Sequence, residues 1–168
     1  MGDITISRAG PNDIEQAWAI VTEYYDSVAV VVREDRPAFL SASFHEGSGF
    51  WLARSRTGVS PLCGENQRND GAVVGCIAMR PLDVFPAAGE VKRLYLQPAS
   101  RGLGIAGLLL DALHEYARTV GYEWLYLDSK DDLETAIRFC EKRGYRRCAR
   151  YNDNPQATIF MNYPCVPT

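Results

Sequence analysis

The sequence lacks any apolar run close to the roughly 20 residues that a membrane-spanning helix needs. It also lacks a leader in which a charged stretch is followed by an apolar one. Basic residues form no stripe, and 18 Lys and Arg stand against 21 Asp and Glu, for a formal net charge of −3. We therefore expect a soluble, cytoplasmic protein with neither a membrane nor a nucleic acid as its partner.

Paired or clustered cysteines are missing as well. The five cysteines show no C-x-x-C spacing, their number is odd, and neither of the two histidines lies near them in a ligand-like pattern. We expect no disulfide framework and no metal site. The cysteines in question are Cys63, Cys76, Cys140, Cys148 and Cys165.

Hydrophobic periodicity predicts eleven elements in the order β-α-α-β-β-β-α-β-α-β-β. No internal repeat or linker interrupts the 168 residues, so we expect a single domain over 1–168. A polar, glycine- and proline-containing stretch at 56–71 predicts a long mobile hairpin loop. The expected strands lie near 3–8, 49–55, 72–80, 89–96, 123–128, 145–147 and 157–162, and the expected helices near 14–25, 36–45, 105–120 and 133–140.

A glycine-rich turn between a strand and a long helix is the most informative segment. It covers residues 101–106, where Gly102 and Gly104 let the backbone come close to a ligand. The first turn of the following helix presents N–H groups without intrahelical acceptors, at the positive end of the helix dipole. This arrangement suits a diphosphate.

The helix after this turn keeps an apolar stripe for over four turns and stops at Gly121. Its opposite face is polar, and the periodicity places His114 on that face, in solvent. The apolar stripe consists of Ile105, Leu108, Leu109, Ala112, Leu113, Tyr116, Ala117 and Val120.

A nicotinamide-nucleotide site is the first alternative for the glycine turn. Residues 102–107 satisfy the G-x-G-x-x-G pattern, and Asp128 lies about where a ribose-binding acid belongs. Against this interpretation, the preceding strand carries Lys92 and Arg93, which a parallel strand buried on both faces would not tolerate. Too little chain follows Asp128 to complete a doubly wound sheet.

Four segments resemble the GNAT superfamily of acyl-CoA-dependent N-acyltransferases. Residues 101–106 resemble its pyrophosphate loop, and residues 4–14, 90–96 and 136–145 resemble, in order, its first strand and helix start, its fourth strand, and its last helix with the turn into the next strand. The resemblance implies an α/β (α+β) fold: one GNAT-type domain with a central mixed, mostly antiparallel sheet of about seven strands, flanked by about four helices. It also implies acetyl-CoA as the cofactor.

The same resemblance assigns the coenzyme contacts. It implies a bulge in the fourth strand that leaves backbone amides free to meet the acyl carbonyl and pantetheine. The expected coenzyme-binding residues are Leu94, Tyr95, Leu96, Arg101, Gly102, Leu103, Gly104, Ile105, Ala106 and Ala136.

Transfer of an acyl group to an amine needs an uncharged amine, an oxyanion partner and a proton for the departing thiolate. The resemblance makes Glu90 the candidate base, since related enzymes often place a carboxylate there. The alternative for Glu90 is an ion pair with Lys92 or Arg93.

Cys140 stands where the family usually has a tyrosine that protonates the thiolate. A thiol can donate that proton, but Cys140 also shares the apolar stripe of its helix, so packing is the alternative. A covalent acyl-cysteine route stays open, as does a non-catalytic acyl-CoA-binding sensor. Tyr126, Tyr145, Tyr151 or water could replace the missing tyrosine.

The acceptor is expected between the first two helices and the loop before the last strand, with Tyr25, Tyr151 and Asn154 as its contacts. These aromatic and amide groups favour a small-molecule amine or amino acid, and a peptide or protein amine is the alternative. The acidic composition favours a cationic acceptor. Whether the chain forms a homodimer stays open at this stage.

Overall fold

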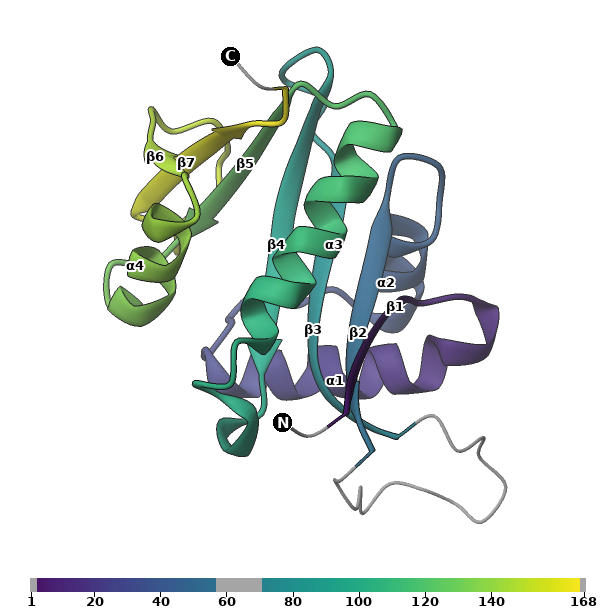
Figure 1. Ribbon diagram of the computed structural model, residues 1–168. Coiled ribbons are helices and arrows are strands. Elements are labelled where there is room, and N and C mark those ends of the chain that lie inside the picture. Colours follow the sequence, from purple (N-terminus) through teal and green to yellow (C-terminus); the bar gives the residue numbers. More distant parts are fainter. Residues whose placement is uncertain (1–2, 57–70, 167–168) are drawn as a thin grey trace.

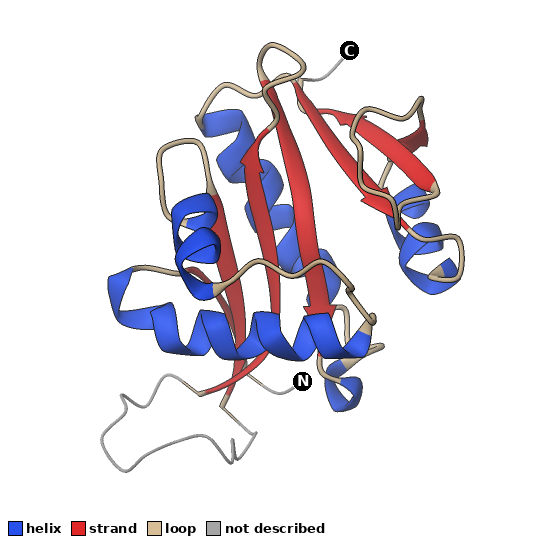
Figure 2. Ribbon diagram, turned by 180° about the vertical axis from the view of Figure 1, so that it is seen from behind, coloured by secondary structure: helices blue, strands red, loops and turns tan. Residues whose placement is uncertain are grey.

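The computed structural model describes residues 3–56 and 71–166, which form a seven-stranded sheet with helices on both faces (Figures 1 and 2). Helices α1 and α2 cover one face, and α3 and α4 cover the other. The strands are β1 (Ile4–Arg8), β2 (Gly49–Ser55), β3 (Ala72–Pro81), β4 (Ala88–Leu96), β5 (Trp124–Ser129), β6 (Arg146–Arg147) and β7 (Ile159–Pro164). The helices are α1 (Ile14–Ser27), α2 (Arg36–Ser43), α3 (Ile105–Thr119) and α4 (Glu134–Lys142), with 3-10 turns at Pro11–Asp13 and Pro98–Ser100.

The strand order is β1-β2-β3-β4-β5-β7-β6, and β4 with β5 is the one parallel pair among the strands described. This mixed, mostly antiparallel sheet confirms the expected fold class and element order. It also removes the nicotinamide interpretation, because a dinucleotide-binding fold needs consecutive parallel strands joined by crossover helices.

Strand β2 shows why the centre of the sheet is so apolar. All seven of its residues are buried, because helices cover both of its faces. Trp51 and Ala53 contribute to the core beneath α3, whereas Phe50 and Leu52 contribute to the core beneath α1 and α2. Successive side chains of a strand point to opposite faces, so one continuous apolar run serves two cores.

The structure corrects the predicted faces of α3. Leu110 and His114 are buried, whereas Leu108 and Val120 are 47% and 38% exposed. The His114 ring stacks on Tyr163 at 4.3 Å between centroids, and its Nε2 lies 3.0 Å from the hydroxyl of Tyr145. The prediction of a solvent-exposed His114 is therefore wrong, because β7 and the turn after α4 cover a helix face that periodicity alone would leave in water.

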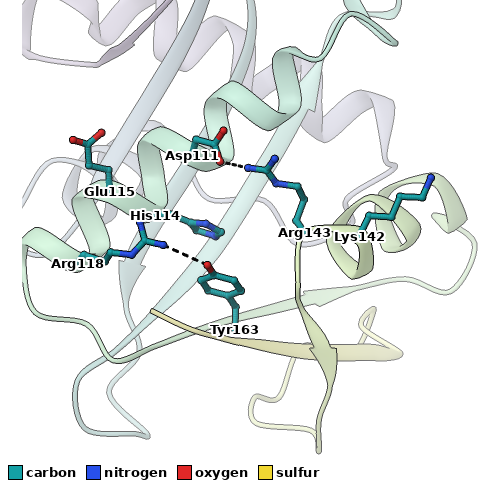
Figure 3. Close-up of a pocket in the computed structure, with 7 residues that line it drawn as sticks. All are labelled: Asp111, His114, Glu115, Arg118, Lys142, Arg143 and Tyr163. Carbon is teal, nitrogen blue, oxygen red and sulfur yellow. Dashed lines mark hydrogen bonds and ion pairs between the residues drawn. The ribbon is translucent and has the colours of Figure 1, made fainter. Parts of the chain in front are cut away.

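Burial, followed by the positive charge of Arg118, lowers the pKa of His114 to about 4. The ring is therefore neutral at physiological pH. His114 also borders an open hollow of about 580 Å³ beside α3 and α4 (Figure 3). There, Arg118 donates to Tyr163, and Arg143 forms an ion pair with Asp111.

Most predicted boundaries agree with the structure to within two residues. The last strand is the clearest shift, since it covers Ile159–Pro164 instead of 157–162. The loop predicted over 56–71 lies almost wholly outside the described residues, as does Cys63. Among the residues described, no helix combines the length and apolarity needed to cross a bilayer.

Candidate active site

Strands β4 and β5 separate after a short parallel pairing. Their register joins Ala88–Glu90 to Trp124–Tyr126, and no further pairs follow among the described residues. Beyond this point each strand pairs only with its outer neighbour, β3 or β7. The sheet therefore opens along a seam on the side where β4 leads into the glycine turn.

A bulge in β4 reorients the side chains beside this seam. Cys76 pairs with Tyr95 and Ala78 with Lys92, so two residues of β4 lie opposite a single residue of β3. Arg93 occupies the bulge with φ of 56°, a left-handed conformation that costs a non-glycine residue roughly 1–2 kcal/mol. Lys92 and Arg93, although adjacent, consequently line the same cleft.

The glycine turn is open at the surface. Gly102 and Gly104 have φ of 76° and 78°, and a Cβ added to either would meet no atom within 4 Å. The Arg101 side chain folds back, and its Nε donates to the carbonyl of Leu96 at 3.1 Å. Gly104 is the N-cap of α3, so the amides of Ile105 and Ala106 have no acceptor within the helix, whereas that of Gly107 donates to the Gly104 carbonyl at 3.1 Å.

A cleft of about 470 Å³ lies on the α1 side of the seam. The end of α1, residues 28–34, the strands β3 to β5 and residues 152–157 line it. Tyr25 and Asn154 are part of this lining, as the sequence predicts for acceptor contacts. Tyr151, the third predicted acceptor contact, is buried and does not line the cleft, and its hydroxyl donates to Glu90 instead.

Hydrogen bonds join the two walls of this cleft. The amide of Val31 donates to the side chain of Gln156 at 3.1 Å, and the Gln156 amide donates to the carbonyl of Ala29 at 3.4 Å. The Lys130 ammonium donates to the carbonyl of Val28 at 3.0 Å, at the C-terminal end of α1. One side of the cleft is therefore closed.

The charge of the cleft differs from that of the chain. Whereas the whole chain has a net charge of −3, cations outnumber anions in the cleft lining. The cations are Arg33, Arg80, Lys92, Arg93 and Lys130, and the anions are Glu34 and Asp128.

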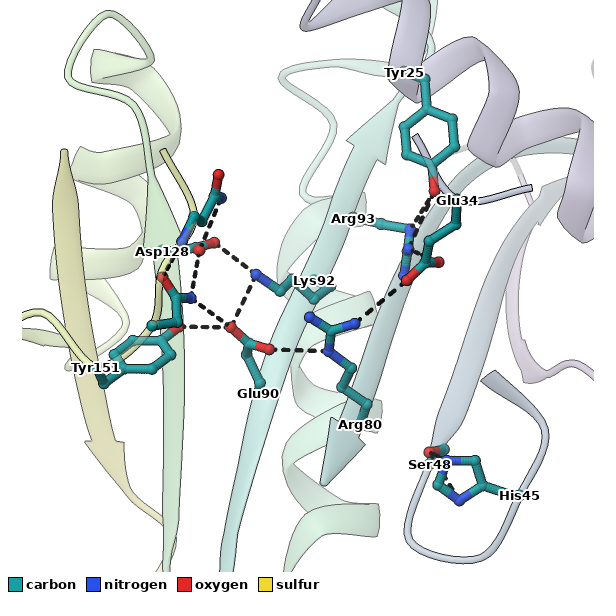
Figure 4. A network of polar contacts seen from close by, with 12 residues as sticks. Tyr25, Glu34, His45, Ser48, Arg80, Glu90, Lys92, Arg93, Asp128 and Tyr151 are labelled. Atoms are coloured by element: carbon teal, nitrogen blue, oxygen red, sulfur yellow. Dashed lines mark hydrogen bonds and ion pairs between the residues drawn. The ribbon is translucent and has the colours of Figure 1, made fainter. Parts of the chain in front are cut away.

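Glu90 is 2% exposed and is the centre of a polar network under the cleft (Figure 4). Its Oε1 accepts from Lys92 at 2.9 Å, from the Tyr151 hydroxyl at 3.0 Å and from Asn152 at 3.1 Å. Its Oε2 accepts from Arg80 Nε at 3.0 Å. The ion pair with Lys92, the alternative to a role as base, is present, and the four donors are divided as three on Oε1 and one on Oε2.

Asp128 is a second carboxylate of this network and, unlike Glu90, lines the cleft. Its Oδ1 lies 2.8 Å from Lys92 Nζ, and its Oδ2 accepts from Asn152 at 2.7 Å and from Asn154 at 3.0 Å. Burial alone would raise the pKa of Asp128, but the charge and hydrogen bond of Lys92, together with the two asparagines, bring it below its ordinary value. Asp128 is therefore ionised at neutral pH.

A third carboxylate, Glu34, joins two arginines at the other end of the network and also lines the cleft. Its Oε1 lies 3.4 Å from Arg80 Nη1, and its Oε2 forms an ion pair with Arg93. The Arg93 guanidinium also donates to the hydroxyl of Tyr25, from Nη2 at 3.1 Å and from Nε at 3.3 Å. The alternative pairing of Arg93 with Glu90 is not what the structure shows.

The sequence model of the acetyltransferase (GNAT) family matches residues 18–145. The chain belongs to this family. Its membership identifies the domain as an acyl-CoA-dependent N-acetyltransferase domain, as the sequence resemblance implies. The family as a whole uses acetyl-CoA.

Two proteins with sequences similar to this chain are named as acetyltransferases. An uncharacterized N-acetyltransferase of Schizosaccharomyces pombe is 36% identical over 51% of this chain and 52% of its own length. The IAA acetyltransferase of Azospirillum brasilense is 37% identical over 58% of this chain and 64% of its own length. The chain thus spans about half to two thirds of these two relatives.

A solved GNAT acetyltransferase from Staphylococcus aureus shares the fold of this GNAT domain. It superposes with a TM-score of 0.76 at 18% identity, covering 98% of this chain and 100% of that chain.

Cys140 of this GNAT domain belongs to the main core under α3 and does not line the cleft. Burial, then the neighbouring Glu141 carboxylate, raise the pKa of its thiol to about 11. The thiol therefore keeps its proton at neutral pH. Ala136, one turn earlier on α4, is exposed, as a coenzyme contact requires.

Several residues of the network lie outside the sequence prediction. Asp128 enters that prediction only as a ribose ligand, and the roles of Arg80, Glu34 and Asn152 do not enter it. Glu90 and Lys92 share a face of a strand by their spacing of two, which could have indicated one end of the network. The remaining members come together only when β3, β5, the segment between α1 and α2, and the loop after β6 fold against β4.

Proposed function

We propose that the domain transfers the acetyl group of acetyl-CoA to a small amine, by direct attack in a ternary complex. The observation that supports this acceptor class is the cleft of about 470 Å³ beside the bulge of β4. Its volume falls within the range of small-molecule sites, about 300–1,000 Å³. The hydrogen bonds through Gln156 and Lys130 close one side of the cleft, so an extended peptide could not leave the cleft on that side.

The coenzyme is proposed to bind across the seam. The diphosphate would lie on the amides of residues 101–106, where the two left-handed glycines leave open space. Amides of Leu94, Tyr95 and Leu96 follow the bulge and would meet the pantetheine and the acyl carbonyl. A backbone N–H there supplies the oxyanion partner that the tetrahedral intermediate needs.

Asp128 is proposed to attract the ammonium form of the acceptor into the cleft. An α-amine of pKa about 7.8 costs only about 1 kcal/mol to deprotonate at neutral pH, so a strong base is not required. Glu90 is buried and accepts from four donors, and its proposed role is to position Lys92, Tyr151 and Asn152. Direct proton removal by Glu90 would first require its carboxylate to become accessible from the cleft, which it does not line.

Cys140 remains the candidate for protonating the CoA thiolate. Its raised pKa keeps the proton on the thiol, which opposes a thiolate nucleophile and also makes the thiol a weaker acid than an ordinary cysteine. We therefore favour direct transfer over an acyl-cysteine intermediate.

The test is release of CoA thiol from acetyl-CoA across a panel of small amines, amino acids and peptides. We expect release well above the buffer rate with some small amine and slower release with peptides bearing the same terminal residue. Tight CoA binding without accelerated release for any amine would instead identify an acyl-CoA sensor. Preference for peptides would establish the alternative acceptor class.

A further inference from the structure

Arg93 combines a buried charge with an unusual backbone. Its side chain is only 9% exposed, yet it lines the cleft from the left-handed position of the β4 bulge. Its guanidinium lies 5.8 Å from the ring centre of Tyr25 and 6.0 Å from that of Phe39. Aromatic rings and a hydroxyl orient this planar group, as in sites that recognise a carboxylate.

A second arginine points to the same place. Arg80 comes from β3, and its Nη1 and the Nη2 of Arg93 both contact the carboxylate of Glu34 (Figure 4). Arg80 is held on its other side by Glu90 at 3.0 Å. Two oriented guanidinium groups thus face one carboxylate at the cleft, in a geometry suited to charge-assisted hydrogen bonds.

Glu34 is the most exposed of the three carboxylates in the network. Its side chain is 26% exposed, compared with 3% for Glu90 and 7% for Asp128. It belongs to a segment without helix or strand between α1 and α2, in which Val31 and Val32 are 79% and 77% exposed. Its two partners, by contrast, come from the central strands.

We propose that Arg80, Arg93 and the Tyr25 hydroxyl form a subsite for a carboxylate of the acceptor, and that Glu34 occupies this subsite until the acceptor displaces it. The inference rests on the proposed function and narrows the acceptor to an amine that also bears a carboxylate, such as an amino acid. Its ammonium faces Asp128 and its carboxylate faces Arg93. Glu34 then acts as an internal competitor that weakens binding of the acceptor.

The experiment measures binding of the acetylated product, which requires no turnover. The ¹⁵N-labelled protein with CoA is titrated with twenty N-acetyl amino acids and their carboxamides, and the Nε–H resonance of Arg93 is followed. We expect one or more acids to shift this resonance and the matching amides to bind at least tenfold more weakly. Glu34→Gln should lower the Kd of those acids at least fivefold and leave that of the amides unchanged.

Two further variants complete the design. Arg93→Lys keeps the charge and the fold but loses the planar fork, and should raise the Kd of the acids at least tenfold. Glu15→Gln makes the same chemical change at an exposed glutamate paired with Arg36 on the surface, and should change nothing. Thermal unfolding of each variant verifies that it is folded.

Three results would overturn the proposal: equal Kd values for acids and amides, weaker acid binding in Glu34→Gln, or no acid binding in that variant. Thiol release with amino acids and amino-acid amides is measured separately. Failure of release with every amine refutes the proposed function, whereas the titration still decides the subsite.

Discussion

At the scale of the residue, burial determines what Cys140 can do. A thiol with a pKa of about 11 is a thiolate in roughly one molecule in 10⁴ at pH 7. The covalent alternative needs that thiolate, whereas proton donation needs the thiol. Cys165 is its counterpart within the same core: it is 2% exposed, and burial raises its pKa to about 11 as well.

Replacing each of these cysteines by alanine separates chemistry from packing. We expect Cys140→Ala to lower kcat about 10²-fold, the lower end of general acid catalysis, because water must then protonate the thiolate. Cys165→Ala should leave kcat unchanged, and both variants should lose a similar amount of stability in urea unfolding. Similar kcat values in the two variants would leave Cys140 a packing role alone.

Intact-mass spectrometry of the wild type with acetyl-CoA and no amine provides the complementary measurement. We expect no acetylated protein. A stable adduct on Cys140 would restore the covalent route.

At the scale of the element, the glycine turn and the β4 bulge show how far the sequence could predict the site. The turn could be predicted, because glycines followed by an amphipathic helix carry their conformation locally. The network around Glu90 could not, since its members come from β3, β4, β5 and the loop after β6. The resemblance implies a bulge in this strand without placing it at Arg93, and no glycine or asparagine in the sequence marks the left-handed residue.

A pair of glycines flanking α3 tests the diphosphate site. Gly104 and Gly121 have φ of 78° and 85°, and an added Cβ meets nothing within 4 Å at either. Alanine should therefore cost roughly 1–2 kcal/mol of stability at both positions through backbone strain. We expect Gly104→Ala alone to weaken CoA binding, at least tenfold by calorimetry, because its methyl group occupies the space of the diphosphate.

Equal CoA affinity in Gly104→Ala and Gly121→Ala would contradict the placement of the diphosphate at this turn. Gly121→Ala introduces the same backbone strain at the other end of α3. If it leaves the CoA affinity unchanged, a loss of affinity in Gly104→Ala cannot be attributed to destabilisation of α3.

At the scale of the whole molecule, one buried histidine connects stability to pH. His114 has a pKa of about 4 in the folded chain against an ordinary value of 6.5. The unfolded state therefore binds the proton more readily, and stability falls as pH drops from about 6.5 toward 4. Protonation of His114 can lower the free energy of unfolding by at most about 3 kcal/mol. This loss occurs at a higher pH than the loss from Asp128, whose lowered pKa affects stability only below about pH 3.8.

Urea unfolding of the wild type, His114→Phe and His45→Gln at pH 7 and pH 5 checks this expectation. The wild type should lose roughly 1–2 kcal/mol more than His114→Phe over this interval, because phenylalanine keeps the stacking on Tyr163 but does not titrate. His45→Gln removes the exposed histidine and should follow the wild type. Parallel pH dependences in the wild type and His114→Phe would contradict the buried, neutral state of the ring.

The short pairing of β4 with β5 interrupts the backbone hydrogen bonds of the sheet near its centre. Three residue pairs make up the strand pairing between the block β1 to β4 and the block formed by β5, β7 and β6. The salt bridge between Lys92 and Asp128 spans the gap beyond them. A coenzyme lying in that gap would contact strands of both blocks and add backbone contacts where the pairing between β4 and β5 stops, above a core under α3 that the two blocks already share.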